Sequence, residues 1–170
     1  MESLEIIDML WSKEPPYDYD GEFWKIKLDE GINKEFGVGW VPRPYQKPSP
    51  PIAISVLSPN SRTALEAGKR GWIPVSGNFM HSRYLRSHWD MYAQGAAEVG
   101  QPADPSIWRV SRSVLVADSD AEAQDYLYDP KSGFSHYYKY FRYSFGRRGV
   151  AKMGVNDETM ADDDITIDDF

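Results

Sequence analysis

An α/β fold built on a parallel sheet is predicted by the order of segments along this chain of 170 residues. Short apolar runs, typical of strands, alternate with longer amphipathic stretches, typical of helices, and the connections between them are short. The expected strands are 52–57, 72–76 and 108–117. Because a strand–helix–strand unit places its two strands parallel, we expect a parallel sheet rather than a sandwich.

The first fifty residues predict a helix, a strand and an extended segment. Residues 2–12 place apolar side chains at helical spacing, and the prolines that follow at Pro15 end that helix. Residues 17–28 alternate in polarity, which predicts one strand entered through a turn at Asp20-Gly21. Residues 41–51 hold five prolines, so we expect an extended surface segment there.

The stretch from 52 to 68 predicts a buried strand followed directly by a helix. The run 52–57 is nearly all apolar, as in a strand that is covered on both faces. The helix is expected over 59–68, with Ser58 as N-cap, Pro59 in the first helical position and Gly68 at the end.

Three more helices are expected. A long one covers 78–99 and ends at Gly100, and another begins after Ser119, where Glu122 completes a capping box. The stretch 134–148 mixes aromatic and basic residues, a composition also found in proteins that bind single-stranded nucleic acid. Its aromatic residues fall on one helical stripe, which favours packing in a core or a subunit interface.

The formal net charge of −7 comes from the C-terminal segment. Seven acids and no basic residue lie beyond Asn156, whereas residues 1–156 are balanced. We therefore expect 156–170 to be an acidic, loosely ordered tail, and net acidity argues against nucleic acid as the main partner. No apolar run is long enough to span a membrane, so no membrane partner is expected.

Cysteine is absent, which excludes disulfides and thiolate metal sites and fits a reducing compartment, so we expect a cytoplasmic protein. The acidic N-terminus also lacks the basic region of a signal peptide. The three histidines, His81, His88 and His136, show no metal-ligand spacing, and no metal is expected. No residue can be assigned a catalytic role from the sequence.

The best candidate site is the junction between the strand 52–57 and the helix that follows. A helix N-terminus offers free N–H groups and the positive end of its dipole, and Ser58, Asn60 and Ser61 add side-chain donors. Ligands of α/β folds bind at the carboxyl ends of strands, where this junction lies. The alternative is that Ser58 only caps the helix, and spacing alone favours that alternative.

Three stretches together resemble the bacterial-luciferase-like family of flavin-dependent monooxygenases. They read EPPYDYDGEFWKIKL, PRPYQKPSPPIAISVLSPNSRTALEAGKRGWIPV and VSRSVLVADSDAEAQDYL. The second carries most weight, because a proline run, a strand, a Ser-Pro turn and a Gly-Trp-Ile sequence follow one another. The resemblance covers about residues 2–128.

The resemblance implies a (β/α)8 TIM-type barrel, of which this chain would be the C-terminal half, so residues 1–170 are expected to form one incomplete barrel domain. It further implies that reduced FMN and O2 oxygenate a small organic substrate, with a separate flavin reductase supplying the reduced FMN, and that the protein is a homo-oligomer. The FMN phosphate would lie at Leu57, Ser58, Asn60 and Ser61. The catalytic residues would belong to the half that is absent here.

Two alternatives remain open at this point. A deazaflavin-dependent hydride-transfer enzyme of the same superfamily would share the barrel and the phosphate end. A half-barrel without enzymatic activity, acting as a binding module, would explain why the chain lacks recognisable catalytic residues.

Overall fold

The computed structural model describes residues 1–169, which fall into two compact units, 1–51 and 52 onward. The expectation that both belong to one incomplete barrel domain stays a prediction.

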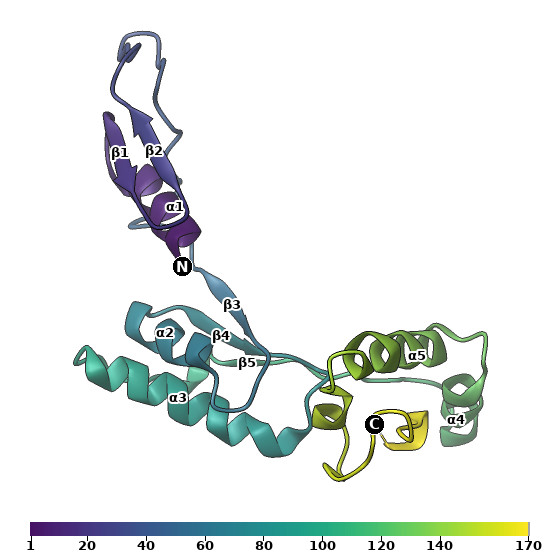
Figure 1. The fold of residues 1–170 in the computed structure, drawn as a ribbon. Helices are drawn as coiled ribbons and strands as arrows, with labels where there is room; N and C mark the ends of the chain where they lie inside the picture. The colour runs from purple at the N-terminus through teal and green to yellow at the C-terminus, as the bar shows by residue number, and fades with distance from the viewer. Residues whose placement is uncertain (170) are drawn as a thin grey trace. The chain divides into compact units, whose positions relative to one another are not determined.

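The first unit consists of a helix and a β-hairpin (Figure 1). Helix α1 (Glu2–Ser12) is followed by the antiparallel strands β1 (Tyr17–Asp20) and β2 (Lys25–Leu28). The predicted turn at Asp20-Gly21 and the strand entered through it are confirmed, and that strand is β2. The sequence did not predict β1, which precedes the turn and pairs with β2.

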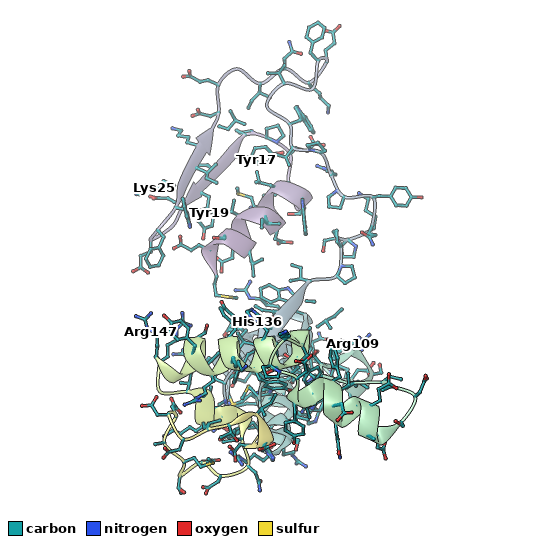
Figure 2. All side chains as sticks on the ribbon, turned by 90° about the vertical axis from the view of Figure 1, so that its right-hand side faces the viewer. Tyr17, Tyr19, Lys25, Arg109, His136 and Arg147 are labelled. Carbon is teal, nitrogen blue, oxygen red and sulfur yellow. The ribbon has the colours of Figure 1, made fainter. Side chains whose placement is uncertain are left out.

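Side chains of the hairpin and of α1 hold this unit together. The carboxylate of Glu2 accepts hydrogen bonds from the backbone N–H groups of residues 22–24 in the hairpin turn. Tyr17 is buried, and the hydroxyl of Tyr19 donates to the carboxylate of Glu5 at 2.9 Å (Figure 2). This bond and burial raise the pKa of Tyr19 to about 12, burial being the larger cause.

The segment 41–51 has no regular structure, in agreement with its prolines.

The second unit contains a three-stranded parallel sheet in the order β3-β4-β5. Its strands are β3 (Ala53–Val56), β4 (Ile73–Ser76) and β5 (Arg109–Val110). The prediction that the three strands are parallel neighbours is confirmed. The predicted strand 108–117 is too long, because pairing with β4 ends at Val110 and residues 111–117 continue without a strand partner in the part of the chain described.

Helices α2 (Arg62–Arg70) and α3 (Leu85–Glu98) pack against the sheet and against each other (Figure 1). Buried alanines from both helices, together with Tyr92, fill this interface. Ala53 and Ser55 of β3 stay exposed, so the expectation that this strand is covered on both faces is wrong for the described residues.

The predicted helix 78–99 is divided. A turn at 78–80 precedes the short 3-10 helix η1 (Ser82–Tyr84), and α3 begins only at Leu85. The side chain of His81 caps η1 by accepting a hydrogen bond from the backbone N–H of Arg83. A second 3-10 helix, η2 (Pro105–Ile107), precedes β5.

The C-terminal part is helical and aromatic. Helix α4 (Asp120–Tyr128) has the predicted Ser119 cap, and α5 (Gly133–Gly146) carries the aromatic stripe, with His136 and Arg147 toward opposite ends of it (Figure 2). Phe141 is buried and stacks on Phe145 at 4.4 Å between ring centroids, as expected for core packing.

The acidic segment lies beyond η3 (Ala151–Gly154) and includes the short η4 (Ile167–Asp169). Ile165 is fully buried against Ala151 and Val155, and Met160 packs on the same cluster. Residues 157–164 form turns, with no helix. The expectation that 156–170 is loosely ordered stays a prediction.

Candidate functional site at the carboxyl ends of the strands

The carboxyl ends of the three parallel strands meet at one edge of the sheet, which is where ligands of α/β folds bind. Three segments begin at this edge: 57–61 after β3, 77–81 after β4 and 111–113 after β5. Backbone hydrogen bonds join the first residues of these segments to the neighbouring strands. The N–H of Gly77 donates to the carbonyl of Val56, and the N–H of Ser111 donates to the carbonyl of Ser76.

The predicted phosphate residues lie together after β3, but the helix begins later than predicted. Pro59 and Asn60 form a turn, and Asn60 has a left-handed backbone with φ of 49°. Asparagine tolerates that conformation, which cannot continue into a helix. Ser61, not Ser58, is therefore the N-cap of α2, and the predicted helix 59–68 is wrong at its start.

The end of α2 was also predicted wrongly. Gly71 ends the helix with a left-handed φ of 67°, as expected for a C-terminal glycine. Gly68 lies inside the helix, where α2 and α3 approach closely: a Cβ added to Gly68 would lie 2.1 Å from the carbonyl oxygen of Tyr92.

The four predicted site residues differ in accessibility. Leu57, Ser58 and Asn60 are exposed, whereas Ser61 retains only 4% of its surface. The backbone N–H of Asn60 donates to the hydroxyl of Ser87 on α3, so that donor is already used. The hydroxyl of Ser58 and the first N–H groups of α2, at Arg62 and Thr63, form no hydrogen bond within residues 1–169.

The first turn of α2 is positive without a compensating acid. Arg62 is exposed in that turn and forms no ion pair within the described part of the chain. A cation at a helix N-terminus is unfavourable by itself, because it faces the positive end of the helix dipole. An anion at this position would relieve that repulsion and accept hydrogen bonds from the free N–H groups.

A buried polar network lies beneath the junction. The indole N–H of Trp108 donates to the hydroxyl of Ser76 at 2.9 Å, and Ser76 Oγ lies 2.9 Å from Nδ1 of His88. Ser76 is fully buried and His88 is 1% exposed. Trp108 also stacks on Trp89 of α3, with 5.8 Å between ring centroids. The network therefore ties the end of β4 and the entry to β5 to the N-terminal half of α3.

The protonation state of His88 follows from its surroundings. Burial, opposed by the main chain of Ser58 and reinforced by the nearby positive charge of Arg112, lowers the pKa of His88 from its ordinary value of 6.5. Because Trp108 can only donate, Ser76 is free to donate to Nδ1, which places the imidazole proton on Nε2. Nε2 has no hydrogen-bond partner of ordinary geometry within residues 1–169.

The sequence did not single out Ser76, Trp108 or Arg112. Ser76 offered the only signal, a polar residue that ends an apolar strand. His88 was considered in the sequence as a possible metal ligand, and no metal was expected there. Within the described residues no three acidic or histidine side chains are placed to hold a metal ion. Residues 1–169 also contain no helix with the length and apolar character needed to cross a membrane.

The family model of luciferase-like monooxygenases matches residues 1–164. In Pseudomonas putida, 3,6-diketocamphane 1,6-monooxygenase is 32% identical in an alignment of 137 residues that covers 78% of this chain and 36% of that protein. From the same organism, 2,5-diketocamphane 1,2-monooxygenase 1 is 31% identical over 72% of this chain and 34% of its own length. The chain thus spans about a third of these curated relatives.

Two solved structures resemble this fold. One is a type II Baeyer-Villiger monooxygenase, the oxygenating constituent of 3,6-diketocamphane monooxygenase from Pseudomonas putida, solved in complex with FMN. It aligns with a TM-score of 0.75 and 27% identity over 99% of this chain and 46% of that chain. Monooxygenase RslO1 from Streptomyces bottropensis aligns with a TM-score of 0.56 and 19% identity over 73% of this chain and 35% of its own, which supports the fold alone.

Proposed function

Because this chain belongs to the luciferase-like monooxygenase family, we propose that it forms part of an enzyme in which reduced FMN and O2 oxygenate a small organic molecule. The single observation that supports this most is the structural alignment over 99% of the chain with a monooxygenase solved with FMN. Bound reduced FMN would supply the electrons that activate O2. A separate flavin reductase as the source of reduced FMN is part of the proposal.

The sheet β3-β4-β5 is proposed to be a section of a (β/α)8 barrel. Parallel strand order, helices between consecutive strands and polar segments at the carboxyl ends support this. In such a barrel β3 and β5 would each gain another neighbour. A homo-oligomeric state remains an expectation that rests on the resemblance alone.

The junction at 57–61 is proposed to hold the FMN phosphate, with hydrogen-bond donors that differ in part from those expected from the sequence. The N–H of Asn60 is taken by Ser87, so the available donors are the first N–H groups of α2, the Ser58 hydroxyl and the Asn60 amide. Arg62 adds a positive charge in the same turn. Uncommitted donors, one cation and no acid fit a phosphate group. Buried Ser61 would act mainly by starting the helix.

The substrate is proposed to be a ketone with a small apolar skeleton. The relatives are named for diketocamphane monooxygenation, and the relative solved with FMN is a Baeyer-Villiger monooxygenase. Such an enzyme inserts one oxygen atom of O2 beside a carbonyl carbon to give an ester or lactone, and reduces the other oxygen atom to water.

Replacement of the phosphate donors tests the binding site. Because Ser58 is not the helix cap, Ser58→Ala removes one donor without the loss of a cap, and Asn60→Gly keeps the left-handed turn while removing the amide. Hydrogen bonds that involve a charged group contribute about 1.5–3 kcal/mol. We expect Arg62→Gln to weaken FMN binding of the full-length protein roughly tenfold, and each other variant several-fold.

Arg86→Gln serves as the control, since Arg86 is an exposed arginine of α3 that pairs with Asp90 at 2.8 Å. FMN affinity is measured by fluorescence quenching, with the thermal midpoint recorded for each variant. If Arg62→Gln and Ser58→Ala bind FMN as tightly as Arg86→Gln does, the junction only starts a helix.

A further inference from the structure

A second polar region lies at the ends of β4 and β5, outside the phosphate junction. A cavity of about 240 Å³ is lined there by the loop after β4, by Arg112 and by the aromatic face of α5. Its lining includes Asn78, Phe79, His81, Arg112, Tyr137 and Tyr138. The volume is somewhat below the range for drug-sized ligands, so it suits a small molecule.

The polar lining is held in place by its own hydrogen bonds. The amide nitrogen of Asn78 donates to the hydroxyl of Ser113 at 3.0 Å, and the hydroxyl of Tyr137 donates to the amide oxygen of Asn78 at 3.4 Å. These bonds join the segment after β4 to the segment after β5 and to α5. The cavity wall is therefore ordered before any ligand binds.

Two donors at this cavity are not committed elsewhere. Nη1 of Arg112 donates to the carbonyls of Ser111 at 2.8 Å and of Gly77 at 3.4 Å, which leaves Nε and Nη2 without a partner within residues 1–169. Nδ1 of His81 accepts the backbone N–H of Arg83, so the neutral ring carries its proton on Nε2. No carboxylate is among the described residues that line the cavity.

The remaining wall is aromatic. Phe79, Tyr137 and Tyr138 line it, and the ring of Phe79 is itself supported by Phe141 at 5.6 Å and by Phe145 at 5.1 Å between centroids. A guanidinium and an imidazole N–H beside an aromatic wall, with no acid, match a compact apolar molecule that carries one oxygen acceptor.

We propose that Arg112 and His81 bind the carbonyl oxygen of the ketone substrate, with its apolar skeleton against Phe79 and Tyr137. The choice of a ketone rests on the proposed function; the choice of residues rests on the cavity alone. A charged donor at a carbonyl oxygen binds it more strongly as negative charge develops there, so this contact would assist nucleophilic attack on the carbonyl carbon as well as binding.

The test is ligand binding to the full-length protein without flavin, so that it does not depend on the FMN site. The probes are norcamphor, a bicyclic ketone, and norbornane, the hydrocarbon with the same skeleton, each measured by saturation-transfer NMR titration. Arg112→Gln is expected to weaken norcamphor binding roughly ten- to a hundredfold, the range for a hydrogen bond to a charged group, and norbornane binding less than about twofold.

Further variants make the outcome specific. Arg112→Lys keeps the charge without the planar guanidinium and should lose part of the ketone affinity. His81→Asn keeps an oxygen that can cap η1 but removes the Nε2 donor, and should weaken norcamphor binding several-fold. Arg109→Gln is the matched control: Arg109, a neighbouring exposed arginine, donates to the carbonyls of Ser106 and Trp108 and does not line the cavity.

Three results would overturn the assignment. The first is that Arg112→Gln binds norcamphor as tightly as the Arg109→Gln control does. The second is that Arg112→Gln weakens the binding of norcamphor and norbornane equally, because the arginine would then only support the cavity wall. The third is that norbornane-2-carboxylate binds the parent protein at least tenfold more tightly than norcamphor, which would make this a site for organic anions. FMN binding is measured separately, so a failure of the flavin proposal leaves these results interpretable.

Discussion

Gly95→Ala is expected to destabilise the second unit severely. A Cβ added at Gly95 would lie 2.0 Å from the carbonyl oxygen of Leu65, and one at Gly68 would lie 2.1 Å from that of Tyr92. Both obstacles are backbone atoms, so the only relief is separation of α2 and α3. Overpacking of this kind costs typically about 1–3 kcal/mol, occasionally more, and we expect the upper end or beyond.

The helix propensity of alanine offsets at most about 1 kcal/mol of that cost. A net loss of about 2 kcal/mol would lower the thermal midpoint by roughly 4–8 °C for a chain of this size, measured by circular dichroism. Gly146→Ala is the matched control, because Gly146 also lies in a helix but its added Cβ would meet Asp162 at an ordinary 3.7 Å. Equal midpoints for Gly95→Ala and Gly146→Ala would mean that α2 and α3 do not approach this closely.

Ser76→Ala is expected to have the second-largest effect, because one hydroxyl serves two neighbours, the buried His88 and the half-buried Trp108. Its removal leaves the indole N–H of Trp108 and Nδ1 of His88 without their partner. An unsatisfied buried group costs about 1–3 kcal/mol, so the free energy of unfolding should fall by at least that amount in urea titrations. Ser113→Ala is the control, since the hydroxyl of Ser113 accepts a single exposed bond from Asn78.

The same network predicts an acid-sensitive fold. Below pH 6.5 the unfolded chain protonates His88, whereas the folded protein, in which the pKa of His88 is lowered, resists that protonation. The unfolded state therefore binds more protons, and the free energy of unfolding falls as pH falls from about 7 towards 5. In His88→Gln this pH dependence of the free energy of unfolding should be smaller than in the parent protein. An unchanged slope would show that His88 titrates normally in the folded protein.

Much of the second unit could be predicted from the sequence because its signals are local. Apolar runs located β3 and β4, and Ser119 located the start of α4. The start of α2 was predicted wrongly because Ser58-Pro59 is typical of a helix start. The left-handed conformation of the single residue Asn60, which delays the helix, has no clear sequence signal. Gly68 was wrongly predicted to end the helix. A glycine is needed there because α3 packs closely against α2, and local sequence signals do not reveal such a tertiary contact.

The candidate site could be predicted only in part for the same reason. Leu57, Ser58, Asn60 and Ser61 are neighbours in sequence, so a strand–helix pattern was enough to propose them. Ser76, His88 and Trp108 meet only after folding, and Arg112 reaches the ends of the strands only because β5 pairs beside β4. The over-long strand 108–117 has a similar cause: Val114 and Val116 favour strand formation, yet they remain 75% and 85% exposed without a pairing partner among the described residues.

Anaerobic titration of the full-length protein with reduced FMN, in competition with a reduced deazaflavin cofactor, tests the central proposal most directly. Both cofactors carry a phosphate that the junction could hold, so the comparison distinguishes an FMN monooxygenase from a deazaflavin-dependent hydride-transfer enzyme. We predict that reduced FMN binds at least tenfold more tightly and that Arg62→Gln removes most of that affinity. Preferential binding of the deazaflavin, or binding of neither cofactor, would contradict the proposed function.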